Sequence, residues 1–133
     1  MSEKVKLALI GCGGISGAHV NGYRDIYNRG CREFEYTACC DVSEENAKRR
    51  ADEIEGIQGS KPAVFKDLSS MIKSGAAEAG DICLPHWLHH LAAIEILEGG
   101  LHALVEKPIG ITIKASKKII EAAKEAGLIL ATA

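Results

Sequence analysis

The chain has 133 residues, of which 47% are hydrophobic and 26% are charged, and its formal net charge at pH 7 is −2. This composition is typical of a globular domain, and it gives no basic surface of the kind that binds nucleic acid. No apolar run reaches membrane-spanning length and the amino terminus lacks the apolar core of a signal peptide, so we expect a cytoplasmic protein without a membrane partner.

The five cysteines are Cys12, Cys31, Cys39, Cys40 and Cys83, and no pair has the Cys-x-x-Cys spacing of a metal site. Their odd number and irregular spacing predict free thiols in a reducing compartment. Cys12 lies inside a glycine-rich turn, where a reactive thiol is one interpretation and a small space-filling residue is the favoured one.

Short apolar segments alternate with segments of helical periodicity along the chain. We expect strands at residues 5–10, 34–40, 63–65, 81–84, 103–105 and 128–131. Five helices are expected between the strands. The first ends near residue 28, and the second begins after a Ser43 cap. The third and fourth span residues 68–73 and 87–97, and the fifth runs from a Thr112 cap to Gly127. This alternation predicts one α/β domain over residues 1–133, built on a doubly wound parallel sheet.

Helical periodicity also predicts which side chains of the first two helices face the sheet. For the first helix they are Ile15, Ala18, His19, Gly22, Tyr23 and Ile26. For the second they are Ala47, Arg50, Ala51 and Ile54, which requires the charged end of Arg50 to extend past the core.

A glycine-rich turn follows the first predicted strand. Gly11 can take the tight turn, Gly13 lets the backbone approach a pyrophosphate, and the helix that follows offers N–H groups and a positive dipole end. Ser16 stands at the third glycine position of the G-x-G-x-x-G pattern, where it still permits close packing and could donate its hydroxyl to a phosphate. A strand–helix turn without a ligand has the same pattern, so the turn alone does not establish nucleotide binding.

Asp41 directly follows the second predicted strand. A carboxylate in that place accepts hydrogen bonds from the 2′- and 3′-hydroxyls of an adenosine ribose. It would also repel a 2′-phosphate, so it favours NAD over NADP. The alternative is an aspartate that only caps the following helix.

Three histidines, His86, His89 and His90, follow Pro85 after the fourth predicted strand. Their spacing raises the possibility of a metal site. However, no nearby carboxylate or cysteine completes a ligand set, so we expect no metal. We expect these imidazoles to line a cofactor or substrate pocket or to cap the helix start.

Glu106, Lys107 and Pro108 follow the fifth predicted strand. A lysine at a strand mouth could exchange a proton with a substrate hydroxyl. The alternative is a surface salt bridge before a proline turn.

The assembled motifs resemble the glucose–fructose oxidoreductase / inositol dehydrogenase (Gfo/Idh/MocA) family. The resemblance covers essentially the whole chain, and the Glu-Lys-Pro segment at residues 106–108 is its most specific part. It implies a Rossmann domain that binds NAD or NADP, and Asp41 makes NADP the less expected of the two. It also implies an oxidoreductase that transfers a hydride between the nicotinamide and a sugar, a polyol or a related hydroxy compound.

The resemblance further implies roles for individual residues. The pyrophosphate loop would consist of Gly11, Gly13, Gly14, Ile15 and Ser16, with Asp41 at the adenosine ribose. The residues beside the nicotinamide would be Pro85, His86, His89, Glu106 and Lys107. Lys107 would transfer the substrate proton, and its peptide bond to Pro108 is often cis in the family.

The sequence departs from the family pattern in two respects. Leu84-Pro85-His86 stands where members often have Thr-Pro-Asn. Members also carry a second α/β domain that binds substrate and mediates oligomerisation. We expect that domain to be absent from these residues and the full-length protein to be a homo-oligomer. The alternatives are a free-standing, non-enzymatic dinucleotide-binding or redox-sensing module, and a Rossmann enzyme for another ligand such as S-adenosylmethionine.

Overall fold

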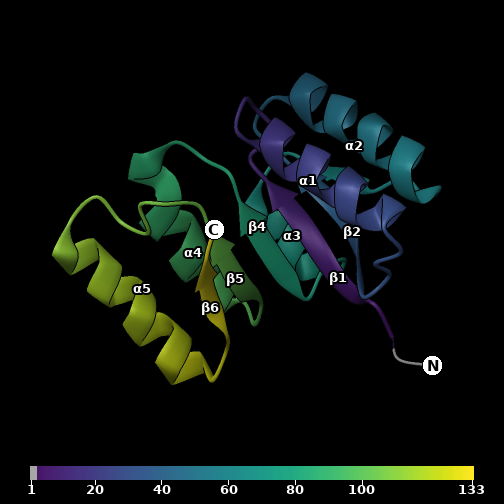
Figure 1. Cartoon of the computed structure of the whole chain (residues 1–133). Helices are drawn as coiled ribbons and strands as arrows, with labels where there is room; N and C mark the ends of the chain where they lie inside the picture. Colours follow the sequence, from purple (N-terminus) through teal and green to yellow (C-terminus); the bar gives the residue numbers. More distant parts are fainter. Residues whose placement is uncertain (1–2) are drawn as a thin grey trace.

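The computed structural model describes residues 3–133, which form one six-stranded sheet (Figure 1). Its strands are β1 (Val5–Ile10), β2 (Phe34–Cys40), β3 (Ala63–Phe65), β4 (Ala79–Ile82), β5 (His102–Val105) and β6 (Leu130–Thr132). All neighbours are parallel, in the order β3-β2-β1-β4-β5-β6. This is the strand order of a doubly wound Rossmann sheet, so the predicted fold class is confirmed.

Helices cover both faces of the sheet. They are α1 (Ser16–Asn28), α2 (Glu44–Gln58), α3 (Leu68–Ser74), α4 (His89–Glu98) and α5 (Ile113–Ala126), with a short 3-10 helix η1 (His86–Leu88) before α4. Figure 1 shows α1 and α2 together on one side of the sheet and α4 and α5 on the other. No helix within residues 3–133 combines the length and the apolar character needed to span a membrane.

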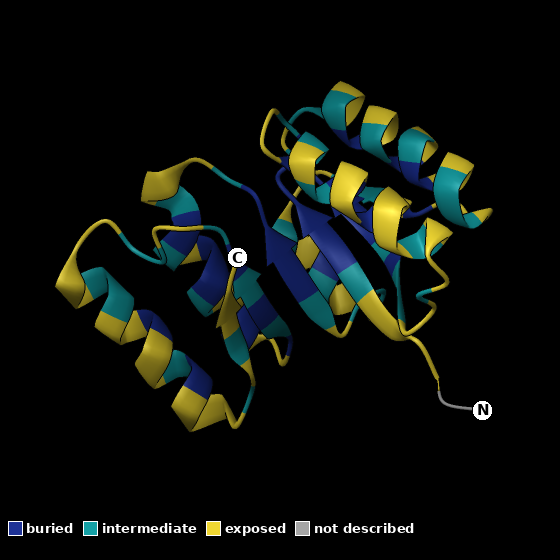
Figure 2. Cartoon of the chain, in the orientation of Figure 1, coloured by how far each residue is buried: buried dark blue, intermediate teal, exposed yellow. Residues whose placement is uncertain are grey.

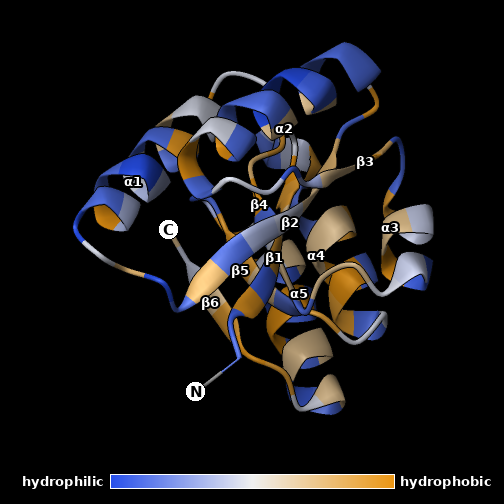
Figure 3. Cartoon of the chain, turned by 90° about the vertical axis from the view of Figure 1, so that its right-hand side faces the viewer, coloured by the Kyte–Doolittle hydropathy of each residue, from blue (hydrophilic) through white to orange (hydrophobic). Residues whose placement is uncertain are grey.

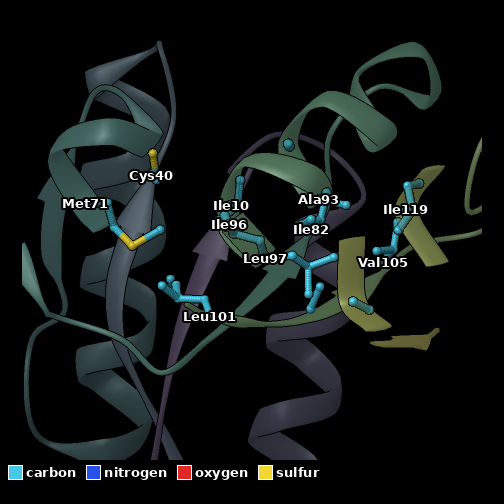
Figure 4. Packing of buried hydrophobic residues seen from close by; sticks show 14 of the residues in the cluster. Ile10, Cys40, Met71, Ile82, Ala93, Ile96, Leu97, Leu101, Val105 and Ile119 are labelled. Atoms are coloured by element: carbon cyan, nitrogen blue, oxygen red, sulfur yellow. The ribbon is translucent and has the colours of Figure 1, made fainter. Parts of the chain in front are cut away.

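The buried side chains form one cluster on each face of the sheet. Strand β1 supplies both clusters, because successive strand residues point to opposite faces. Leu9 belongs to the cluster under α1 and α2. Ile10 belongs to the cluster under α4, which Figure 4 shows. The central strands are accordingly buried, and the outer faces of α1 and α2 are exposed (Figure 2). Figure 3 shows the same contrast in hydropathy, with α2 largely hydrophilic and α4 more hydrophobic.

Side chains cap three of the helix N-termini, and the caps at Ser43 and Thr112 are those that the sequence predicted. Ser43, Asp67 and Thr112 each accept a hydrogen bond from the backbone N–H three residues later, at 3.2, 2.7 and 3.0 Å. Helix α1 differs, because the residue at its N-cap is Ile15 and no side chain bonds to its first turn. The positive end of α1 is therefore left available to a ligand.

The segment after β4 differs from the expectation. β4 ends at Ile82, although Cys83 N still donates to Ile10 O at 2.7 Å, and η1 precedes the expected helix. Trp87 and Leu91 are 62% and 58% exposed, so one side of η1 and α4 faces solvent although its residues are apolar. Strand β4 ends two residues before the expected position. Residues of the following segment 84–88 line a cleft at the carboxyl ends of the strands.

Candidate functional site

A cleft lies at the carboxyl ends of β1, β2 and β4, where the order of the parallel strands reverses. Such switch points are where doubly wound sheets bind their ligands. The cleft is lined by Gly11, Gly13, Gly14, Ile15, Asp41, Val42, Cys83, Leu84, Pro85, His86 and Leu88. An apolar hollow adjoins it and shares Asp41, Val42, Leu84 and Leu88 with it. Most of the predicted site residues are thus brought together, whereas Ser16, His89, Glu106 and Lys107 do not line this cleft.

The glycine turn has the geometry that a pyrophosphate requires. Gly11 has φ +88°, and a Cβ there would lie 2.7 Å from the carbonyl oxygen of Cys83, so only glycine fits. A Cβ at Gly13 or Gly14 would meet nothing within 4 Å, so both positions are open. Within residues 3–133, the backbone N–H groups of Gly13, Gly14 and Ile15 have no hydrogen-bond acceptor. These donors stand at the positive end of α1, where an anion is stabilised.

The hydroxyl of Ser16 does not point into the cleft, contrary to the expectation that it could donate to a phosphate. Ser16 is fully buried, and its Oγ donates to the carbonyl oxygen of Gly13 at 2.5 Å. Arg50 of α2 donates to the same two groups, through Nε to Ser16 Oγ at 2.9 Å and through Nη2 to Gly13 O at 2.8 Å. Ser16 therefore shapes the turn from beneath, and Arg50 places a positive charge under it.

Asp41 connects β2 to the glycine turn. Its Oδ2 accepts from the backbone N–H of Cys12 at 2.7 Å, and its Oδ1 accepts from the backbone N–H of Ser43 at 2.8 Å. The cap of α2 is Ser43, so the interpretation of Asp41 as the helix cap is wrong. The carboxylate faces the cleft with its two oxygens held in place, and each oxygen retains a lone pair for a further donor.

The histidines after β4 separate into different roles. Pro85 and His86 line the cleft opposite the glycine turn. His89 is fully buried, with Nδ1 2.6 Å from the carbonyl oxygen of Pro108 and Nε2 2.9 Å from that of Leu84. The ring of His89, which was expected beside the nicotinamide, is thus enclosed between two backbone segments and does not line the cleft.

His19 of α1 was not predicted as a site residue, yet it links two carboxylates. Its Nδ1 lies 2.9 Å from the carboxylate of Asp81, and its Nε2 lies 2.7 Å from Oε1 of Glu106. These contacts, with that to Asp81 the larger, raise the pKa of His19 to about 11, and the His19 contact lowers the pKa of Glu106. Both partners are carboxylates, which only accept, and an imidazole ring donates from both nitrogens only when it is protonated. His19 is therefore an imidazolium at neutral pH.

The stabilisation that His19 provides should depend on pH in a defined direction. A raised pKa gives stability that is complete below the ordinary value of 6.5 and is lost as pH rises towards about 11. The lowered pKa of Glu106 gives stability that is present above its ordinary 4.5 and is lost in more acidic solution. The unfolding free energies of the wild type and of His19→Gln, measured by urea unfolding, should therefore differ most between pH 4.5 and pH 6.5. A difference in unfolding free energy that grows from pH 6 to pH 9 would contradict this assignment.

Lys107 is exposed, and the structure does not give it the salt bridge proposed as the alternative. Within residues 3–133 its ammonium has no ion pair, and Glu106 pairs with His19 instead. Glu106 Oε2 accepts from the backbone N–H of Lys107 at 3.0 Å, and the peptide bond to Pro108 is cis. Glu106 thus holds the backbone of the lysine and leaves the ammonium free.

The cysteine side chains near the cleft are protonated thiols. A hydrogen bond with Cys39 and burial raise the pKa of Cys12, so the interpretation of Cys12 as a reactive thiol is not supported. Burial raises the pKa of Cys83 to about 11. Cys83 lies close enough to His19 and Asp81 for a shared metal ion, but their polar atoms already bond to one another, with Cys83 Sγ donating to Asp81 at 3.8 Å.

The chain is similar to proteins of known name. One curated relative, scyllo-inositol 2-dehydrogenase (NADP(+)) IolU of Bacillus subtilis, is 31% identical over 126 residues, which are 95% of this chain and 35% of the relative. Another, glycosyl hydrolase family 109 protein 1 of Akkermansia muciniphila, is 30% identical over 92% of this chain and 25% of the relative. The chain thus spans about a quarter to a third of the length of these relatives.

Solved structures agree with the sequence comparison. The WlbA dehydrogenase of Bordetella pertussis, solved with NADH and UDP-GlcNAcA, has a TM-score of 0.80 and 30% identity over 98% of this chain and 35% of that protein. The family model described as oxidoreductase family, NAD-binding Rossmann fold, matches residues 5–133. The chain therefore belongs to the Gfo/Idh/MocA oxidoreductase family, and its residues 5–133 match the NAD-binding Rossmann fold of that family.

Proposed function

We propose that the cleft holds NAD with its pyrophosphate over the start of α1. The observation that carries this proposal is the set of backbone N–H groups at Gly13, Gly14 and Ile15, which lack acceptors and stand beside an open space. Asp41 then accepts from the adenosine ribose. The adenine occupies the apolar hollow beyond it, between Val42 and Leu91.

The nicotinamide end of the cofactor extends towards Pro85 and His86 and the segment that carries Lys107. The bound nicotinamide supplies the hydride chemistry, and the protein supplies binding and orientation. Lys107 exchanges the proton of the substrate hydroxyl through its Nζ, for which the ammonium is suited because it has no carboxylate partner within the described residues. Glu106 fixes the backbone of Lys107.

The substrate class is a sugar, polyol or related hydroxy compound. Relatives named as dehydrogenases of inositol, D-apiose and D-glucosides support this class. A second candidate is glycoside hydrolysis, which is supported by relatives named as family 109 glycosyl hydrolases. The residues of this cleft determine which cofactor binds. We propose that the choice between the two reactions, and the contacts of the expected homo-oligomer, depend on regions that correspond to the parts of the relatives that this chain does not match.

Cofactor selectivity tests the proposal. The wild-type chain should bind NADH more tightly than NADPH, because the Asp41 carboxylate accepts from the ribose hydroxyls and repels a 2′-phosphate. Asp41→Ser should narrow the difference in binding free energy by about 1–3 kcal/mol, the range for a polar contact that is left unsatisfied or repelled. Fluorescence titration of both cofactors measures it, with Asp52→Ser on the exposed face of α2 as the control.

Equal affinities of the wild-type chain for the two cofactors would contradict the role of Asp41. Calorimetry with S-adenosylmethionine separates the rival ligand, for which no binding is expected. A free-standing redox sensor would bind NADH in the same way, and it would differ in having no use for Lys107.

A further inference from the structure

Two histidines, the half-buried His19 and the fully buried His89, hold the backbone around Lys107, and they come from opposite faces of the sheet. His19 lies on α1 and His89 begins α4, and Figure 1 shows these helices on opposite sides of the strands. The side chain of His19 is 14% exposed, and His89 is fully buried. Both rings therefore occupy places where a polar group is retained only if it is bonded.

His19 acts on the amino side of the lysine. It lies between Asp81, which is 1% exposed on β4, and Glu106, whose other oxygen accepts from the backbone N–H of Lys107. Tyr36 of β2 also donates to Asp81, at 2.7 Å, and so fixes the far end of the chain of bonds. The backbone of Lys107 is thereby tied to the middle of the sheet and to the helix whose first turn faces the cleft.

His89 acts on the carboxyl side of the lysine. Its ring is placed between the carbonyl oxygens of Pro108 and Leu84, at 2.6 and 2.9 Å. Leu84 lines the cleft. The ring thus joins the segment after β5 to the cleft wall formed by the segment after β4.

We propose that His19 and His89 are positioning residues that bracket Lys107 and hold its side chain at the mouth of the cofactor cleft. The proposal rests on the proposed function for the role of Lys107. A lysine side chain has a long flexible stem, and proton transfer requires a narrow range of positions. Fixing the backbone on both sides of an exposed lysine restricts the origin of that stem without a bond to the ammonium.

The test uses nuclear magnetic resonance on the whole chain with three variants. In the wild type, the backbone N–H groups of Lys107 and Ile109 should have order parameters of about 0.85. His19→Gln should lower the value at Lys107 to below about 0.6, and His89→Gln should do so at Ile109. His90→Gln is the matched control, because Nδ1 of His90 has no hydrogen-bond partner among the described residues, and it should change neither value.

A second readout reports on the lysine itself. With NADH bound, a nuclear Overhauser contact between the Lys107 side chain and the nicotinamide ring should be present in the wild type and lost in His19→Gln and His89→Gln. Order parameters that stay at about 0.85 in both variants would overturn the proposal that His19 and His89 position Lys107, whatever happens to thermal stability. If His19→Gln does not fold, Glu106→Ala decides, because it removes both acceptor oxygens at a side chain that is 17% exposed and leaves Asp81 and His19 paired.

The two proposals fail separately in this experiment. An Overhauser contact that is missing already in the wild type, with NADH bound, overturns the placement of Lys107 beside the nicotinamide. The order parameters then still support or overturn the bracket, because they do not depend on where the cofactor lies.

Discussion

Replacing Gly13 with valine is expected to abolish NADH binding by this chain while its fold survives. A Cβ at this position meets nothing within 4 Å and the backbone there has no left-handed φ, so the folded protein accepts a branched residue. The side chain would, however, fill the space through which a pyrophosphate reaches the free N–H groups of the turn. Losing two charge-assisted bonds of about 1.5–3 kcal/mol each predicts a decrease in affinity of more than about 100-fold.

Fluorescence titration with NADH measures this decrease, and circular dichroism melts report on the fold. Gly22→Val is the matched control, because Gly22 is exposed on α1 and its Cβ also meets nothing within 4 Å. Gly11→Ala should behave in the opposite way and unfold at lower temperature, since its Cβ would lie 2.7 Å from Cys83 O at φ +88°. An unchanged NADH affinity of Gly13→Val would remove the glycine turn from the cofactor site.

Most of the fold could be predicted from local patterns. The bounds of β1, β2 and β3 match the expectation because each is an apolar or β-branched segment that ends at a glycine or a charged residue. The bounds of β4 were wrong by two residues because Cys83 and Leu84 are as apolar as the strand before them. Only the tertiary path, with Pro85 leading into η1, shows where the sheet ends.

The face of α1 was placed one residue out of register. Ser16, Val20 and Tyr23 are buried, whereas Ile15 and Ile26 are 48% and 37% exposed. Hydropathy ranks a serine below an isoleucine, so the pattern favoured the wrong side. The burial of Ser16 follows from its bonds to Gly13 and Arg50, which join residues far apart in the sequence.

The structure brings the predicted residues together in one cleft where each of them directly follows a strand end. The glycine turn and Asp41 follow strand ends, and the topology brings all strand ends of a parallel sheet to one edge. His19 and Arg50 were missed as site residues because their partners are 62 to 87 and 34 to 37 residues away. The sequence signal for each was its position as a polar residue on an otherwise apolar helix face.

The largest catalytic effect is expected from Lys107→Ala. The chain spans about a third of the length of its dehydrogenase relatives, so the assay needs a substrate domain. Residues 1–133 would be joined to the part of the Bacillus subtilis relative that follows its matched region. In this chimera, Lys107→Ala should lower kcat by about 10²–10⁴-fold, the usual contribution of general acid–base catalysis. NADH affinity should remain within a few-fold, because the proposed function assigns cofactor binding to the glycine turn and Asp41 and not to Lys107.

Two matched variants separate proton transfer from charge. Lys107→Arg keeps the positive charge at the strand mouth, but a guanidinium does not release its proton, so its kcat should fall about as far as that of Lys107→Ala. Lys117→Ala on the exposed side of α5 removes a lysine elsewhere and should leave kcat unchanged. Steady-state kinetics and NADH titration of the wild type and the three variants distinguish a role in proton transfer from a role of the positive charge. Full activity of Lys107→Arg would mean that the lysine acts by charge, and full activity of Lys107→Ala would leave the domain as a cofactor binder whose proton-transfer residue lies in the substrate domain.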